Sequence, residues 1–245
     1  MTTRPFLSRL GWPRSATPVH GHEVVSLELP EFGPVQLARW LHPDARRAPA
    51  SVEPARVAAM RAHLHPGDVA LVIGAAEGAE ALELGLAVGP SGAVVALESD
   101  RAVFPVLAAN SALNRDRVRL FPHLVAVARA GAPPPSGVQA QPLEPFLRAR
   151  HAELIERLRW ISFRFGVHGL ELLETLKPLV TARRPHLRIA VGRTARRSHR
   201  HALLSSLGEL GYRVERFAGD GAGATGPITA ANAMGWKRLD LLAVP

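Results

Sequence analysis

The sequence is poor in several residue types, and each shortage excludes a class of structure or chemistry. It has no cysteine in 245 residues, which excludes disulfide bonds, thiolate zinc sites and cysteine nucleophiles. Aromatic residues make up only 5% of the chain, so stacking platforms for single-stranded nucleic acid are not supported. No run of 18 apolar residues is free of charged residues, and no transmembrane helix is expected.

Lysine is also scarce, because it occurs only as Lys177 and Lys237. The net charge of +9 is therefore carried almost entirely by arginine. Such a bias, beside abundant Ala, Gly and Pro, is more typical of a GC-rich genome than of a dedicated polyanion-binding protein. Nucleic acid is a disfavoured partner, although the charge permits it, and no recognition motif supports it.

The amino-terminal stretch MTTRPFLSRLGWPRS has positive charges but lacks the apolar segment of a secretory signal. We therefore expect a cytoplasmic protein with no membrane partner. A length of 245 residues with 47% apolar residues fits one large globular domain with a short extension.

Strands and helices are expected to alternate along most of the chain. Apolar runs predict strands near 69–73, 93–97, 117–121, 159–165, 186–191, 212–217 and 239–244. Helices are expected near 77–88, 101–113, 143–157, 169–181 and 199–210. This α/β alternation favours right-handed crossovers and a mainly parallel sheet. The last two strands, joined by the glycine-rich stretch 218–236, are expected to pair antiparallel at one end of it.

Residues 1–56 form a separate amino-terminal part in this interpretation. Residues 1–20 predict a loose arm, the alternating EVVSLEL at 23–29 a short hairpin or edge strand, and 43–55 a connector. Helical turns are expected at 57–64. The α/β domain then covers residues 57–245.

A glycine-rich turn followed by an acidic residue is the strongest functional signal. Gly74 and Gly78 follow the strand at 69–73, and Glu98 ends the next strand. In a parallel sheet this order places a glycine loop and a carboxylate at one crevice, where the acid can accept both ribose hydroxyls of a nucleoside. The alternative is a structural turn with an exposed Glu98.

The loop lacks both common phosphate-binding signatures. The pattern GxxxxGK[ST] is absent, and Ala76 stands at the middle glycine of GxGxxG. A nucleoside without phosphates is favoured over a pyrophosphate, and S-adenosylmethionine is the commonest of these.

Several motifs occur in order along residues 60–245: GDVALVIGAAEG, GPSGAVVALESD, LAANSALN, QPLEPFL, FRFGVHGLELLETLKPLV, PHLRIAV, LGELGYRV and LDLLAVP. Together they resemble the FkbM-type class I S-adenosylmethionine-dependent methyltransferases. The resemblance implies a Rossmann-like, mainly parallel seven-stranded sheet with a terminal antiparallel strand. It also implies O-methylation of a hydroxyl on a small-molecule or carbohydrate-like acceptor. The cofactor would be held by Gly74, Ala76, Glu77, Gly78 and Glu98.

The chain departs from that family at four acidic positions. Val72 stands where the first motif has an aspartate, Gly166 and His168 replace acids after the fourth strand, and Gly192 replaces one after the fifth. Four losses on one rim indicate either a changed substrate chemistry or a protein kept as a binding or assembly subunit.

His168 is the candidate general base, because it follows a strand at the expected rim and its ordinary pKa suits the role. Glu171 is a second candidate catalytic residue, or simply an acid favoured in the first turn of a helix. Arg193, Arg196 and Arg197 are candidates for holding an anionic acceptor, against the alternative of a solvated charge run. No acid cluster completes a metal shell, so no metal is expected.

Overall fold

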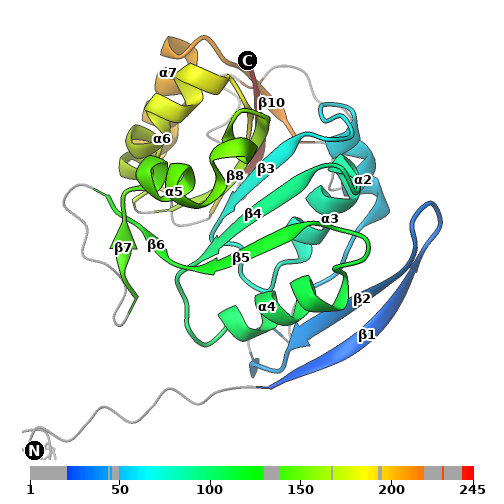
Figure 1. Cartoon of the computed structure of the whole chain (residues 1–245). Coiled ribbons are helices and arrows are strands. Elements are labelled where there is room, and N and C mark those ends of the chain that lie inside the picture. Colours follow the sequence, from blue (N-terminus) through cyan, green and yellow to red (C-terminus); the bar gives the residue numbers. More distant parts are fainter. Residues whose placement is uncertain are drawn as a thin grey trace, which may run out of the picture.

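The structure is a computed structural model that describes residues 21–43, 45, 50–129, 138–166, 168–192, 195–217, 228 and 239–245. A central sheet has helices on both faces, and a long hairpin lies against one side of it (Figure 1). Most of the glycine-rich stretch 218–236, and the loop at 130–137, lie outside the described residues.

The central sheet has seven strands in the order β10-β11-β9-β8-β3-β4-β5. Their bounds are β3 Val69–Ile73, β4 Ala93–Glu98, β5 Leu120–Leu124, β8 Leu158–Phe165, β9 His186–Val191, β10 Arg213–Arg216 and β11 Leu239–Val244. Strands β3, β4, β5, β8 and β9 run parallel, while β11 is antiparallel to both of its neighbours. The predicted mainly parallel sheet is confirmed, and the carboxy-terminal strand is inserted between β9 and β10.

Helices cover both faces of this sheet. One face carries α2 Pro54–Arg61, α3 Ala79–Val88 and α4 Phe104–Leu113, and the other carries α5 Leu143–Ile155, α6 Gly169–Arg183 and α7 Arg197–Glu209 (Figure 1). A short parallel pair, β6 Ala126–Val127 and β7 Ala140–Gln141, lies beside them. None of the described helices is long and apolar enough to cross a membrane.

Burial on both faces explains why the central strands read as continuous apolar runs. Every residue of β4 is buried, and so are the first four residues of β3. Side chains alternate between two cores, so Leu71 packs with α5 and α6 while Val72 packs with α2 and α3. Sheets of this kind bind ligands where the strand order reverses, which here is the carboxyl end of β3 between β4 and β8.

Of the two alternatives for residues 23–29, a hairpin or an edge strand, the structure has a hairpin, in which β1 His22–Leu29 and β2 Gly33–Trp40 pair along their full length. Helix α4 covers the free edge of β2 with two buried asparagines. Asn110 accepts the Ala38 N–H at 2.7 Å and donates to the Ala38 carbonyl at 2.9 Å. Asn114 makes the same pair of bonds with Gln36, at 3.1 and 2.7 Å. The two amides thus replace the missing neighbour strand.

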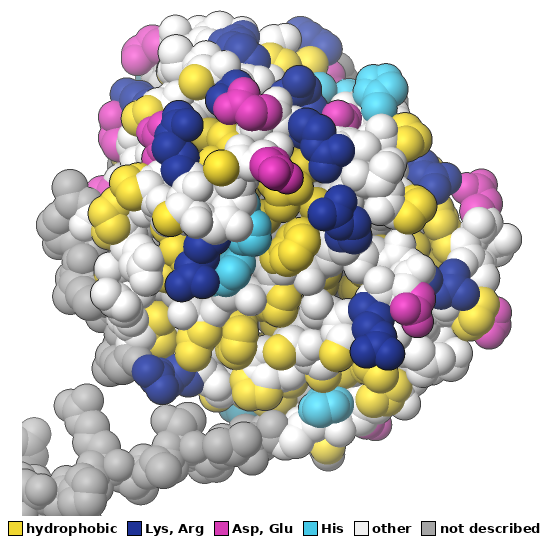
Figure 2. Space-filling view, in the orientation of Figure 1, with side chains coloured by type: hydrophobic (Ala, Val, Ile, Leu, Met, Phe, Trp, Pro, Cys, Tyr) yellow, Lys and Arg dark blue, Asp and Glu magenta, His cyan; other side chains and the backbone are white. Residues whose placement is uncertain are grey.

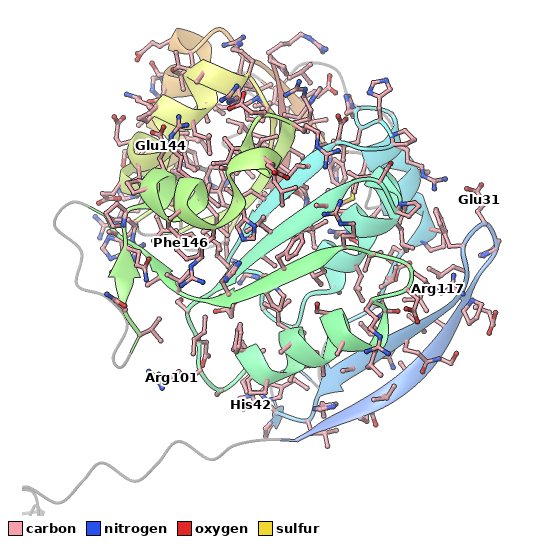
Figure 3. The ribbon with its side chains drawn as sticks, in the orientation of Figure 1. Glu31, His42, Arg101, Arg117, Glu144 and Phe146 are labelled. Carbon is pink, nitrogen blue, oxygen red and sulfur yellow. The ribbon has the colours of Figure 1, made fainter. Side chains whose placement is uncertain are left out.

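A second contact holds the tip of the hairpin. Arg117, which lies beside the hairpin in Figure 3, donates to the Phe32 carbonyl at 2.5 Å. The hairpin also contributes Leu29, Val35 and Leu37 to the core beneath α3. The hairpin is therefore packed onto the α/β core, while the boundary at residue 56 stays a prediction.

Candidate functional site

The glycine loop between β3 and α3 has an unusual backbone. Gly74, Ala76 and Gly78 have φ angles of +77°, +49° and +93°. A left-handed conformation costs a residue with a Cβ about 1–2 kcal/mol, so Ala76 is strained at the position where GxGxxG has its middle glycine. The N–H groups of Gly74 and Ala75 donate to the Leu97 carbonyl at 2.9 and 3.0 Å, which fixes the loop against β4. Strain held by its surroundings is typical of functional sites.

The two glycines of the loop have different surroundings. A Cβ on Gly78 would lie 2.6 Å from Cδ1 of Leu107 on α4, so glycine lets two helices approach closely. A Cβ on Gly74 would meet nothing within 4 Å. The space beside Gly74 is open, and this residue lines both cavities of the site.

Glu98 lies beside the loop, as predicted, and is buried. Its Oε2 accepts the Ala76 N–H at 2.7 Å, and its Oε1 accepts the N–H groups of Ser99 and Asp100, both at 2.7 Å. A carboxylate has about four acceptor positions, so about one remains on Oε2. Glu98 therefore ties the end of β4 to the glycine loop, and a bidentate contact with two hydroxyls would need some of these bonds to open.

Two cavities adjoin the loop and share Ile73, Gly74 and Arg164. The larger, of about 450 Å³, runs from the loop along the start of α3 to β8, β9 and the segment before α2. The smaller, of about 180 Å³, lies at the ends of β3 and β4 and contains Leu97, Ser99 and Val125. Together they form an elongated crevice across the point where the strand order reverses.

A buried ion-pair cluster forms part of the wall of the larger cavity. Arg188 on β9 donates to Glu80 on α3 and to Asp240 on β11, each at 2.5 Å. The guanidinium also lies 5.2 Å from the ring centroid of Phe217. Burial raises the pKa of Glu80, but the charge of Arg188 and hydrogen bonds from Arg188 and Ser162 outweigh it and lower the pKa. Glu80 is therefore ionised at neutral pH.

Glu83, one turn further along α3, is more deeply buried. Its Oε2 accepts from Arg56 Nε at 2.8 Å and its Oε1 from the Glu53 N–H at 3.0 Å. Burial dominates over these contacts and raises the pKa of Glu83 to about 7. The cavity thus contains a carboxyl group that titrates near neutral pH.

We expect Glu83 to make the protein less stable as the pH rises from 4.5 to about 7. Its folded-state pKa of about 7 exceeds the usual value of 4.5, so the folded state holds the extra proton in this window. The stabilisation from this proton is complete below pH 4.5 and is lost once the pH exceeds about 7. A shift of this size corresponds to about 3 kcal/mol.

Urea unfolding of the wild type and Glu83→Gln at pH 5 and pH 8 tests this. The wild type should lose about 2–3 kcal/mol more than the permanently neutral variant. Glu144→Gln, at an exposed helical pair with Arg148, is the control and should follow the wild type. If the free energy of unfolding changed equally with pH in all three proteins, ionisation of Glu83 would not destabilise the folded state.

Glu77, a predicted cofactor residue, has its carboxylate bonded to the hairpin. Its Oε2 accepts the Trp40 N–H of the hairpin at 2.8 Å, and its carbonyl accepts from Asn110 at 2.7 Å. Burial raises the pKa of this carboxyl. Glu77 also lines the larger cavity.

His168 and Glu171, the two candidate catalytic residues, lie together at the start of α6. The distance from His168 Nδ1 to Glu171 Oε1 is 3.7 Å, and both side chains are about half exposed. Neither residue lines the two cavities, although Leu172 in the same turn lines the smaller one. Glu171 Oε2 is buried with no hydrogen-bond partner in the described part of the chain.

Two of the three arginines predicted to bind an acceptor belong to the described residues. Arg193 lies outside the described residues, while Arg196 and Arg197 are exposed at the start of α7. Arg200 turns inward and donates to the Ala195 carbonyl at 3.2 Å. On the face shown in Figure 2, the described arginine and lysine side chains are scattered among apolar and acidic ones, with no continuous basic stripe.

Among the described residues, no three His, Cys, Asp or Glu side chains are grouped as a metal site requires. One imidazole pair occurs, His123 on β5 and His151 on α5, with 2.7 Å between their Nε2 atoms. Two zinc–nitrogen bonds of about 2 Å each would not fit in that distance at tetrahedral geometry. One of the two rings donates its Nε2–H to the other, and burial, assisted by the charges of His151 and Arg150, lowers the pKa of His123 to about 4.

Sequence reasoning missed the ion-pair cluster, although a signal was present. Glu80, Arg188 and Asp240 each interrupt an otherwise apolar stretch that belongs to the centre of the fold. A charged residue on a buried strand must be paired, so Arg188 within HLRIAV and Asp240 within LDLLAV indicate partners for each other. Arg188 and Asp240 are 52 positions apart. They meet because β11 lies next to β9 in the sheet, and this strand order could not be read from the sequence.

No protein-family model matches the sequence, and no curated protein matches it. Solved structures do match. The FkbM methyltransferase from Methylobacillus flagellatus KT aligns with a TM-score of 0.50 at 13% identity, over 73% of this chain and 44% of that one. A putative rRNA methylase from Clostridium thermocellum gives 0.48 at 10% identity, over 77% and 93%. Aeropyrum pernix fibrillarin, crystallised with natively bound S-adenosyl-L-methionine, gives 0.46 at 14% identity, over 93% and 98%.

The strand order, the single antiparallel strand of the central sheet and the likeness to the Methylobacillus structure define the Rossmann-like class I methyltransferase fold. The predicted fold class is confirmed. At these identities the likeness is one of fold, so the activity has to be argued from the site itself.

Proposed function

We propose that the chain is an S-adenosylmethionine-dependent methyltransferase of FkbM type that methylates a hydroxyl of a small-molecule or carbohydrate-like acceptor. One observation carries the proposal: the strained glycine loop and Glu98 meet where the strand order reverses, beside an elongated crevice. This is the arrangement that binds a nucleoside in an open α/β sheet.

The residues at the crevice fit such a cofactor. The backbone of Gly74, Ala76 and Gly78 would pack against it, and Glu98 would accept from the ribose through its remaining Oε2 position. Leu97 and Val125 provide an apolar wall in the smaller cavity, which suits a purine ring. When bound, the cofactor would supply an electrophilic methyl group, so the protein mainly has to bind and align the two reactants.

We assign the general-base role to His168, which would take the hydroxyl proton on one of its ring nitrogens. Glu171, 3.7 Å away, would stabilise the imidazolium that results. Arg196 and Arg197 would orient an anionic acceptor, together with Arg193. His168 and Glu171 follow β8, and Arg196 and Arg197 follow β9, at the same edge of the sheet as the loop.

Titration calorimetry with S-adenosylmethionine and S-adenosylhomocysteine tests the proposal. We expect micromolar binding of both and none of NAD, because the loop lacks a pyrophosphate signature. Glu98→Gln should weaken binding about 10- to 100-fold by removing a charged acceptor, and Glu98→Ala should weaken it further by releasing the Ala76 N–H. Glu144→Gln is the exposed control, and unchanged affinity in Glu98→Gln would remove the ribose assignment.

The role of His168 has its own test once an acceptor is found. His168→Ala should lower the turnover number by about 100-fold or more while cofactor affinity stays the same. His199→Ala, in α7, is the matched control. A turnover number within twofold of the wild type would rule out His168 as the base.

A catalytically inactive binding or assembly subunit is the second candidate. The absence of acids at Val72, Gly166 and Gly192 favours it, and so does the engagement of Glu98 with backbone N–H groups. No binding of either cofactor form at millimolar concentration would make this candidate the leading one, and a protein partner would then be sought.

A further inference from the structure

Arginine side chains without a partner gather at one edge of the central sheet. Most arginines in the described part of the chain form an ion pair, a hydrogen bond or a ring contact. Among the described residues, the arginines with none of these are Arg129, Arg164, Arg196 and Arg197. Arg129 follows β5 and the short β6, Arg164 is near the end of β8, and Arg196 and Arg197 follow β9 (Figure 1). All four therefore lie toward the carboxyl ends of the parallel strands, where open α/β sheets bind ligands.

Two of these four arginines belong to the crevice itself. Arg129 and Arg164 line the smaller cavity, whereas Arg196 and Arg197 line neither cavity. Arg164 is exposed although β8 lies in the middle of the sheet, and Arg129 is partly exposed. Both side chains therefore have accessible surface that a ligand in the smaller cavity can contact.

The charge of the smaller cavity has one sign. Among the described residues that line it, Arg129 and Arg164 are the only charged ones, and Ser99 is the only other one with a polar side chain. A cleft with one sign of charge and apolar walls attracts ligands of the opposite charge. Guanidinium groups bind oxyanions through paired N–H donors. Two guanidinium charges balance a dianion, and a phosphate monoester is such a group at neutral pH.

Arg164 also lies where the two cavities meet, because it lines both of them together with Ile73 and Gly74. The proposed cofactor would span both cavities, so the positive sulfonium in the middle of the molecule would be near this junction. A sulfonium and an unpaired guanidinium repel one another. An anionic acceptor bound beside them removes this repulsion, so the binding of the acceptor and that of the cofactor should favour each other.

We infer that Arg129 and Arg164 bind a dianionic oxyanion of the acceptor, and that the acceptor is a phosphorylated alcohol. The inference rests on the proposed function, because the acceptor is that of the proposed methyl transfer, and it narrows the substrate class. Arg129 and Arg164 are then specificity-determining residues, which select an acceptor by its phosphate group. Arg196 and Arg197, outside both cavities, would contact only those parts of the acceptor that extend toward α7.

Inorganic phosphate is the probe for this site, and the wild-type full chain gives the first test. Calorimetry in a chloride buffer should show that phosphate binds at least about 5-fold more tightly than the monoanion acetate at equal ionic strength. Saturating phosphate should tighten the binding of S-adenosylmethionine about 3- to 10-fold. The affinity for S-adenosylhomocysteine, which lacks the sulfonium charge, should change by less than about 2-fold. Because these comparisons need no mutation, they hold even if a variant fails to fold.

Arg129→Gln and Arg164→Gln add the residue-specific test. Each should weaken phosphate binding about 10-fold or more and reduce the effect of phosphate on S-adenosylmethionine affinity. Without phosphate, Arg164→Gln should bind S-adenosylmethionine about 2- to 5-fold more tightly than the wild type, because the repulsion is gone. S-adenosylhomocysteine should bind both variants as it binds the wild type, which reports that they are folded. Arg148→Gln removes the same charge from an exposed pair with Glu144 and should match the wild type in every measurement.

Failure of this inference can be told apart from failure of the proposed function. Binding of the adenosine compounds without any binding of phosphate would overturn the inference and leave the proposed function intact. Phosphate binding that both glutamine variants retain would also overturn it, since the anion would then bind elsewhere. Acetate binding as tight as phosphate binding would overturn the assignment to a dianion. Phosphate binding that depends on Arg129 and Arg164, without binding of either adenosine compound, would support the anion site and overturn the proposed function.

Discussion

Replacing Arg188 with methionine is expected to lower the free energy of unfolding by about 3–5 kcal/mol. Arg188 is the shared partner of Glu80 and Asp240, and all three side chains are largely buried. Methionine fills much of the same volume but leaves two carboxylates without their counter-ion in the interior. Because whole domains are stable by only about 5–15 kcal/mol, this loss would be visible in urea unfolding at pH 7.

Two further variants show whether unpaired charge causes the loss. Adding Glu80→Gln and Asp240→Asn to Arg188→Met removes the stranded charges, so the triple variant should recover much of the stability. Arg148→Met breaks an exposed pair with Glu144 and should cost less than about 1 kcal/mol. A loss in Arg188→Met as small as that of Arg148→Met would show that water screens the cluster.

The sheet could be predicted because its strands are buried on both faces. Such strands appear as apolar runs, and three strands, β3, β9 and β11, have the predicted bounds. The ends of other elements differ from the predicted ones. β5 begins at Leu120 rather than 117, and α2 begins at Pro54 because proline fits the first turn of a helix.

The position of the glycine loop could also be predicted, because alternating strands and helices indicate a parallel sheet, and the carboxyl ends of parallel strands lie at one edge of it. The contacts of its side chains could not. Glu98 lies where expected, but its bonds to three N–H groups depend on the loop conformation. Glu77 accepts a hydrogen bond from Trp40 at the end of β2. No local sequence pattern indicates where this strand packs against the rest of the fold.

Long-range pairing explains most of what sequence reasoning missed. Asn110 and Ala38 are 72 positions apart, and Arg188 and Asp240 are 52 apart. Each pair consists of polar groups that are satisfied only by one another once buried. A sequence shows that a buried polar residue needs a partner, but the partner is chosen by the packing of elements.

Replacing Asn110 with alanine is expected to cost about 3–5 kcal/mol. The Asn110 amide is fully buried and satisfies three backbone groups, the N–H and carbonyl of Ala38 and the carbonyl of Glu77. Alanine would leave all three without a partner beneath α4. Urea unfolding should show the loss, and hydrogen exchange at the Ala38 amide should become faster at the same time.

Two controls separate this effect from general loosening of the fold. Ser111→Ala, on the neighbouring position of α4, removes one bond to the Leu120 carbonyl and should cost only about 1 kcal/mol. Within the Asn110 variant, the Leu37 amide, which faces β1, should keep its protection while the Ala38 amide loses it. Equal acceleration at both amides would mean that the hairpin unfolds as a whole. In that case Asn110 would be needed to keep the hairpin folded. Its contacts with Ala38 and Glu77 would then do more than join the edge of β2 to α4 and to the glycine loop.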